Sequence, residues 1–275
     1  MVFNPTKTVV HNEGCDLHYW YQGMGPMIIF VPGGNGHGRQ YNPIIEALSD
    51  RFTCVTFDRR GMTASKVDIS KRLNPGQQAR DIRAVIKAMG FDKSIVFGSS
   101  LGGILGYVLA LDHPEIIEHL ITHEPPLSSL LPNHSAIFEW YLKIIEARDT
   151  KGWEAADAIF QQGLVGYKED ERDGRPCAHP ERENSVNFFE NELETVASYT
   201  PNLHRIKENG TSVGIMTGEL SGDAFYALST YEQAKILDCP RHDVPGYHQG
   251  FENRVEEFVP YFLNMLAVLE ARKGI

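Results

Sequence analysis

Cysteine is scarce in this sequence, and the cysteines present are not spaced as pairs. The 275 residues include four of them, Cys15, Cys54, Cys177 and Cys239, with no C-x-x-C and no Cys/His ligand spacing. Scattered cysteines are typical of reduced thiols in an intracellular protein. The sequence therefore argues against a disulfide framework and against a cysteine-based zinc site.

Runs of basic residues and long apolar segments are also missing. Lys and Arg number 26 against 36 Asp and Glu, which gives a formal net charge of -10. Nucleic acids and anionic membranes attract the opposite balance of charge. The N-terminal residues lack the apolar core of a signal peptide, and the most apolar stretch, 95–111, is interrupted by glycines and serines and is too short to span a bilayer. We therefore expect a cytoplasmic protein that binds neither nucleic acid nor membrane.

Strand-like and helix-like segments alternate in the first half of the chain, which is typical of a parallel α/β sheet. The predicted strands are short runs of apolar or β-branched residues: 27–31, 52–57, 94–97 and 118–122. The spacing of apolar residues predicts helices between them: 41–48, 75–89 and 101–111. The sequence thus predicts an α/β fold, in which helices flank a mostly parallel central sheet.

The pattern changes beyond residue 126. Residues 127–210 contain no convincing strand and three helix-like stretches: 135–148, 152–164 and 183–198. Strand character then returns at 212–216 and weakly at 235–237, before a final amphipathic helix over 255–270. We interpret 1–126 and 211–275 as the core, and 127–210 as a helical lid inserted over the carboxyl ends of the strands. Open α/β sheets bind their ligands at that edge.

A nucleophile-elbow motif, G-x-S-x-G, occurs at 98–102 with Ser100 at its centre. An elbow must lie between a strand and a helix, because the tight turn lifts the serine hydroxyl out at the sheet edge. Ser100 meets this condition, whereas a second match at 210–214 places Ser212 at the start of a strand. The sequence favours Ser100 as a nucleophile over the plainer alternative, a glycine-rich turn whose serine caps the helix.

A serine nucleophile needs a base, and in an elbow protein the base is a histidine late in the chain. His242 and His248 both qualify by position. His248 lies in a glycine-flanked loop before the final helix, which suits an imidazole at the sheet edge. His242, between Arg241 and Asp243, is more typical of a solvated loop. We therefore predict that His248 is the base.

A glycine-rich loop, 32–38, follows the first apolar strand. It does not match a phosphate-binding loop, since no Gly-Lys-Ser/Thr follows, or a Rossmann loop, since Gly34, Gly36 and Gly38 alternate with single residues. The loop is therefore either a flexible surface segment or the source of a backbone N–H for an oxyanion hole. In the second case the other donor is the N–H of Leu101, directly after Ser100.

Together with the D-x-R-G segment 58–61, these motifs resemble the α/β-hydrolase superfamily. They cover the whole core in the family's order, and 127–210 lies where the family inserts its lid. The resemblance implies that Gly34 supplies an oxyanion N–H, with Pro32 in place of the commoner histidine. It also implies that the segment beginning at Asp58 is structural and not catalytic.

The acid of the triad has more than one candidate. Most of the family carries it after the strand that follows the lid, but Ser221 occupies that position here and Asp223 lies two residues further on. The segment 122–126 instead resembles fungal lactone hydrolases of the zearalenone-degrading type, in which a Glu at the end of the strand before the lid completes the triad. The resemblance implies Glu124 as the acid. The alternatives left open are Asp223 and a merely solvated carboxylate at 124.

We therefore expect a serine hydrolase that cleaves a carboxylic ester or lactone through Ser100, His248 and Glu124, by way of an acyl-enzyme. No metal or organic cofactor is implied, the expected partner is a small-molecule ester or lactone, and a homodimer is left open. The same apparatus supports C–C bond hydrolysis, acyl transfer or cofactor-free lyase chemistry, and a non-catalytic receptor is the alternative outside enzymes. Epoxide and haloalkane hydrolysis are disfavoured because they use an aspartate nucleophile.

Aromatic residues are frequent in the expected lid. They either line an apolar pocket for a bulky substrate or form the ordinary core between helices, and helical spacing is typical of the second role. These residues are Phe138, Trp140, Tyr141, Trp153, Phe160, Phe188 and Phe189.

Overall fold

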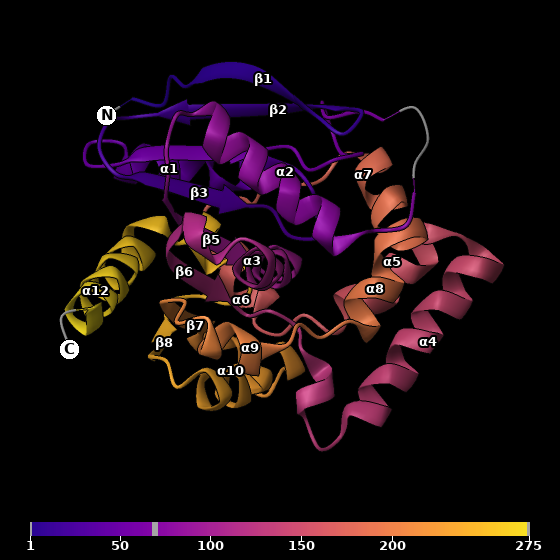
Figure 1. The fold of residues 1–275 in the computed structure, drawn as a ribbon. Helices are drawn as coiled ribbons and strands as arrows, with labels where there is room; N and C mark the ends of the chain where they lie inside the picture. The colour runs from indigo at the N-terminus through magenta and orange to yellow at the C-terminus, as the bar shows by residue number, and fades with distance from the viewer. Residues whose placement is uncertain (1, 68–70, 274–275) are drawn as a thin grey trace.

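Within residues 2–67 and 71–273, which the computed structural model describes, eight strands form one sheet in the order β1-β2-β4-β3-β5-β6-β7-β8 (Figure 1). The β1–β2 and β2–β4 pairs are antiparallel, and the pairs from β4 through β3 to β8 are parallel. The strands are β1 (Thr6–Asn12), β2 (Cys15–Gln22), β3 (Met27–Val31), β4 (Thr53–Phe57), β5 (Ser94–Ser99), β6 (Ile117–His123), β7 (Val213–Gly218) and β8 (Arg241–Val244).

Helices cover both faces of the sheet, which is why β3, β4 and β5 are buried at every position. Alternate residues of a strand point to opposite faces, so Ile28 and Phe30 of β3 pack against α1 and α12, while Ile29 packs against α2 and α3. The flanking helices are α1 (Asn42–Leu48), α2 (Pro75–Ala88), α3 (Leu101–Asp112), α10 (Phe225–Leu237), α11 (Gly250–Asn253) and α12 (Val255–Lys273). Short 3-10 turns are η1 (Gly38–Tyr41), η2 (Pro114–Ile116), η3 (Ser128–Leu130) and η5 (Glu219–Ser221).

Between β6 and β7 the chain forms a helical segment, which we call the inserted helices (127–210). In Figure 1, α4, α5, α7 and α8 lie together on the side of the molecule opposite α12. Their buried side chains, such as Ile144 and Leu193, belong to the same apolar cluster as the α2–α3 face of the sheet. The segment contains α4 (His134–Lys151), α5 (Trp153–Gln161), α6 (Tyr167–Asp173), α7 (Arg182–Asn187), a π-helical turn η4 (Phe188–Glu192), α8 (Leu193–Ser198) and α9 (Leu203–Glu208).

The prediction of a strand at 235–237 was wrong. These residues end helix α10, where Leu237 is buried against the sheet, and the last strand is β8 instead. A run of three apolar residues fits one turn of an amphipathic helix as well as a short strand, so its composition alone could not decide. Among the described residues, no helix is both long enough and apolar enough to cross a membrane.

Candidate active site

Ser100 lies in a sharp turn between β5 and α3. Its backbone has φ 56° and ψ −126°, a region that costs a non-glycine residue about 1–3 kcal/mol. The turn closes because its glycines allow close backbone contact: a Cβ at Gly98 would lie 2.3 Å from the Gly102 carbonyl oxygen, and a Cβ at Gly102 would lie 2.1 Å from the Val31 carbonyl oxygen. The Ser100 N–H donates to the His123 carbonyl at 2.8 Å, which ties the turn to β6. The geometry is that of a strand–turn–helix elbow.

The second G-x-S-x-G serine has a different position. Ser212 precedes β7 at the amino end of that strand, and its hydroxyl is hydrogen-bonded to Nδ1 of His119 at 2.8 Å. Because the strands are parallel, this is the sheet edge opposite the one that carries Ser100. Ser212 therefore has a structural contact away from the candidate site.

His248 and Glu124 form a hydrogen-bonded pair at the carboxyl edge of the sheet. Nδ1 of His248 lies 2.7 Å from Oε2 of Glu124, and Oε1 of Glu124 accepts the Gly218 N–H at 2.9 Å. Burial alone would raise the pKa of the fully buried Glu124 carboxyl. The hydrogen bond from His248, the charge interactions with His123 and His248 and the nearby Ser221 hydroxyl together outweigh this, so the pKa lies below its ordinary value. The carboxylate therefore stays ionised and holds the ring so that Nε2 is the nitrogen left for chemistry.

Ser100 and His248 line the same cavity. Within the part of the chain that the structure describes, no direct hydrogen bond joins the Ser100 hydroxyl to the imidazole. Catalytic hydrogen bonds of ligand-free enzymes are often long and shorten only with substrate bound, so the shared cavity is the relevant observation. The structure thus brings Ser100, His248 and Glu124 to one edge of the sheet.

The other candidates for base and acid lie elsewhere. His242 is in β8, paired in register with Met216 of β7. Asp223 is exposed after the η5 turn, whereas Ser221 is fully buried, so the carboxylate that contacts His248 is Glu124. A further histidine, His123, is buried beside Ser99, and burial lowers its pKa to about 4, which keeps it neutral.

The glycine-rich loop lies beside the elbow, since a Cβ at Gly33 would lie 3.3 Å from the Cβ of Ser100. Gly33, Gly34 and Leu101 all line the cavity, and the Gly36 N–H donates to the Gly33 carbonyl at 3.0 Å. A Cβ at Gly34 would lie 2.8 Å from the Phe188 ring, so a larger residue would push the loop or the ring aside. The Leu101 N–H is the first of α3, and N–H groups in the first turn of a helix have no partner within the helix. Both predicted oxyanion donors therefore border the same space as Ser100.

The cavity has a volume of about 340 Å³, and aromatic side chains form much of its wall. Six of the seven aromatic residues named from the sequence line it, and the seventh, Phe138, is exposed on α4. Trp140 and Phe160 stack with ring centroids 6.0 Å apart. Among the described residues, the Phe, Tyr and Trp side chains that line the cavity are Trp140, Tyr141, Trp153, Phe160, Phe188, Phe189, Phe225, Tyr226 and Phe251.

The sequence did not indicate the polar residues of the cavity wall. Apart from Asn35, in the glycine-rich loop, and Gln249, which follows His248, they lie in segments with no motif, and only the fold brings them together. They are Asn35, Gln40, Asp157, Gln161, Cys177, His179, Ser185 and Gln249. These side chains supply hydrogen-bonding groups to an otherwise apolar site.

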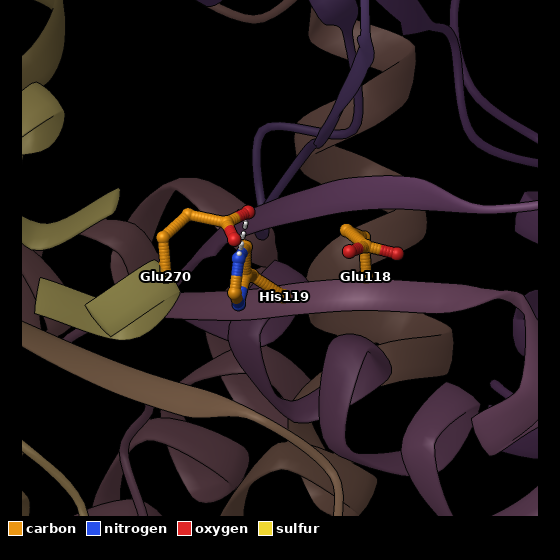
Figure 2. A group of neighbouring side chains, drawn as sticks. All are labelled: Glu118, His119 and Glu270. Atoms are coloured by element: carbon orange, nitrogen blue, oxygen red, sulfur yellow. Dashed lines mark hydrogen bonds and ion pairs between the residues drawn. The ribbon is translucent and has the colours of Figure 1, made fainter. Parts of the chain in front are cut away.

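Glu118, His119 and Glu270 place three potential metal-ligand atoms within 4.8 Å of one another (Figure 2). The ligand atoms already have protein partners: Nε2 of His119 is 2.8 Å from Glu270, and Lys273 pairs with both carboxylates. The group joins β6 to α12 at the sheet edge away from Ser100. Its contacts are those of a structural ion-pair network.

Comparison with known proteins agrees with this architecture. Residues 26–176 match the family model described as alpha/beta hydrolase fold, and the chain belongs to that family. The uncharacterized hydrolase YraK of Bacillus subtilis (strain 168) is 28% identical over 274 residues, covering 92% of this chain and 93% of that protein. The family and this relative's name support hydrolase activity.

Two solved structures show the same fold. The enol-lactonase from Burkholderia xenovorans LB400 has a TM-score of 0.72 and 18% identity, covering 94% of this chain and 100% of that chain. Est816, described as an N-acyl homoserine lactone degrading enzyme, has a TM-score of 0.69 and 18% identity, covering 94% of this chain and 99% of that chain. At such identities the likeness shows the α/β-hydrolase fold.

Proposed function

We propose that this protein hydrolyses a carboxylic ester or lactone through an acyl-enzyme on Ser100. The observation that carries the proposal is the 2.7 Å hydrogen bond between His248 and the buried Glu124, at the cavity that Ser100 also lines. A serine in an elbow, a histidine and a carboxylate that orients it are the parts that acyl transfer needs.

In the proposed reaction the Ser100 hydroxyl attacks the substrate carbonyl while Nε2 of His248 accepts its proton. Glu124 stabilises the imidazolium that forms, and the N–H groups of Gly34 and Leu101 stabilise the oxyanion of the tetrahedral intermediate. His248 then protonates the departing alkoxide, which in a lactone remains attached to the acyl group. Water, activated by the same histidine, cleaves the acyl-enzyme and restores Ser100.

The cavity supports an apolar or aromatic substrate. Its aromatic wall comes mainly from the inserted helices, which we propose act as a lid over the site. A volume of about 340 Å³ suits a small drug-sized molecule. The names of both structural neighbours point to lactones, so aryl and acyl lactones come first in a substrate screen, followed by p-nitrophenyl esters and β-diketones. Turnover of diketones alone would place the activity in C–C bond cleavage.

Labelling with a fluorophosphonate probe tests the nucleophile. We expect one adduct, at Ser100, because the probe reacts with a serine activated by an adjacent base. Intact-mass measurement and peptide mapping show the site, with Ser100→Ala as the negative control and Ser212→Ala as a matched variant of the second motif. An adduct on Ser212, or labelling that survives in Ser100→Ala, contradicts the assignment.

Matched variants of the two acidic candidates test the triad. We expect Glu124→Gln to lose at least ~10²-fold in kcat, because it removes the charge that stabilises the imidazolium. Asp223→Asn, at an exposed position, should lose less than about tenfold. Thermal unfolding of both variants separates a folding defect from a catalytic one. If Asp223→Asn is the inactive variant, Glu124 is not the acid.

A further inference from the structure

We propose that Arg59 positions the oxyanion-binding N–H of Gly34, and that Glu192 of the inserted helices holds Arg59 in place. The inference rests on the proposed function, because it takes Gly34 as an oxyanion donor. It assigns a role to an ion pair that the triad does not use.

Arg59 is fully buried directly after β4 and points at the glycine-rich loop. Its Nε and Nη2 both donate to the Gly33 carbonyl oxygen, at 3.1 and 3.0 Å. That carbonyl and the Gly34 N–H belong to one peptide unit, which is planar and trans. The two groups therefore point in opposite directions, and fixing the Gly33 oxygen on one side fixes the direction of the Gly34 N–H on the other.

The charge of Arg59 also acts on this peptide unit. A cation at the carbonyl oxygen polarises the amide, and hydrogen bonds that polarise one another in sequence become stronger. The Gly34 N–H is thereby a better donor to a developing negative charge than an amide bonded only to water. Because the guanidinium is fixed before substrate binds, no reorganisation is needed at the transition state.

Glu192 completes the arrangement from the inserted helices. Its two oxygens accept from Nη1 and Nη2 of Arg59 at 2.8 and 2.7 Å, and it is 2% exposed. Glu192 ends the π-helical turn η4, whose first residue, Phe188, packs on Gly34 and lines the cavity. One turn of the inserted helices thus contacts both the donor residue and the cation behind it. Single π-helical turns often occur at functional sites.

A second contact holds the same loop. The Asn184 amide group of α7 donates to the Asn35 carbonyl at 2.9 Å, and its oxygen accepts the Thr63 N–H at 2.7 Å. The glycine-rich loop is therefore held at two carbonyls: that of Gly33 by Arg59, which Glu192 holds in turn, and that of Asn35 directly by Asn184. Well-packed apolar residues often stabilise a core as well as a buried ion pair does. A contribution to stability is therefore not enough to explain why Arg59 and Glu192 are paired here.

The chain offers a matched control in the adjacent pair Arg60–Asp81. Nε and Nη2 of Arg60 donate to the two Asp81 oxygens at 2.8 and 2.7 Å, and Asp81 is fully buried. Arg60 also donates to the Asn12 and Glu13 carbonyls, so this pair joins the β1–β2 hairpin to α2. It has the same chemistry as Arg59–Glu192 but holds a different part of the fold.

The test compares Arg59→Met/Glu192→Met with Arg60→Met/Asp81→Met. Both double variants remove a buried pair without leaving an unpaired charge. The readout is labelling of Ser100 by a fluorophosphonate, whose phosphoryl oxygen occupies the oxyanion position. The dependence of the labelling rate on probe concentration gives two constants: kinact, the maximal rate constant of labelling, and KI, the probe concentration at half of that rate. For the Arg59–Glu192 variant we expect kinact to fall about 10²-fold, as for loss of an oxyanion donor, with KI changed less than about twofold. For the control we expect both constants to stay within about twofold of the wild type.

Equal loss of kinact in both double variants, or no loss in Arg59→Met/Glu192→Met, overturns the proposal. If that variant does not fold, Glu192→Gln decides. Glutamine keeps one oxygen to accept from Arg59, but its NH2 group cannot accept the second hydrogen bond and the charge is lost, so the guanidinium is held less firmly. We expect a fall in kinact of about tenfold at constant KI. An unchanged kinact in a folded Glu192→Gln protein also overturns the proposal. Failure of the wild-type protein to label at Ser100 would instead refute the proposed function.

Discussion

Replacing Glu252 with glutamine should increase the free energy of unfolding by about 4 kcal/mol at pH 8 but by only about 1 kcal/mol at pH 5. Glu252 lies in α11, four residues after His248, and is 2% exposed. Oε1 accepts the Ala178 N–H at 2.5 Å, while Oε2 has no hydrogen-bond partner among the described residues. Burial raises the pKa of this carboxyl from an ordinary value of 4.5 to about 8, against the opposing effect of hydrogen bonds from Ala178 and Cys177.

The sign of the effect follows from which state ionises first. Between pH 4.5 and about 8 the unfolded chain loses the Glu252 proton while the folded protein keeps it. The folded state therefore binds more protons, and the stability that the group contributes is fully present below pH 4.5 and is lost as the pH rises through about 8. At ~1.36 kcal/mol per pH unit, ionisation of Glu252 lowers the free energy of unfolding, relative to its value at low pH, by about 1 kcal/mol at pH 5 and by about 4 kcal/mol at pH 8.

Glutamine is neutral at every pH and keeps an oxygen for the Ala178 N–H, so the variant lacks this loss. Urea unfolding of the wild type and of Glu252→Gln at pH 5, 6, 7 and 8 measures the difference directly. Glu139→Gln, at an exposed position of α4, controls for the loss of one acidic side chain. We expect the advantage of Glu252→Gln to grow with pH toward about 4 kcal/mol. Stability curves that run parallel from pH 5 to pH 8 would refute the reasoning.

Two smaller effects follow from contacts outside the triad. Gly102→Ala should lower Tm by several degrees, because the added Cβ would lie 2.1 Å from the Val31 carbonyl oxygen. Gly90→Ala is the control: nothing lies within 4 Å of its added Cβ, so the variant should lose only the roughly 1 kcal/mol of stability that a positive φ costs an alanine. Glu270→Gln should change the free energy of unfolding by less than ~1 kcal/mol, because this carboxylate is largely exposed. The difference from the wild type should shrink in 0.5 M NaCl, and urea unfolding at low and high salt measures it.

The sequence predicted the strands that are buried on both faces and missed β1, β2 and β8, which lie at or next to the two edges of the sheet. β3, β4 and β5 appear as largely apolar or β-branched runs because helices cover them on both sides, and β6 contains the shorter run 120–122. β1 is the outermost strand and most of its residues are exposed or half-buried, so it carries no apolar run to detect. The Glu13–Gly14 turn that pairs β1 with β2 depends on positive φ at both residues, which the sequence did not make obvious.

The sequence pointed to those residues of the candidate site that lie in a recognisable local pattern. Ser100 and His248 lie in glycine-containing segments at expected places along the chain, and Glu124 ends a predicted strand. Arg59 and Glu192 are separated by 133 positions, and neither segment has a pattern that pairs it with the other. Only the fold brings that guanidinium and carboxylate together.

The position of Glu124 also shows how a carboxylate that directly follows β6 can contact His248. The two strands are parallel neighbours, with His123 opposite Met216, so their carboxyl ends meet at one edge. Glu124 has φ 49° and its N–H donates to the Met216 carbonyl at 3.2 Å, which bends the chain toward β7 at this residue. Its side chain then reaches the Gly218 N–H, and the small, fully buried Ser221 occupies little space nearby. A glutamate, one methylene longer than aspartate, is suited to reach across from the adjacent strand.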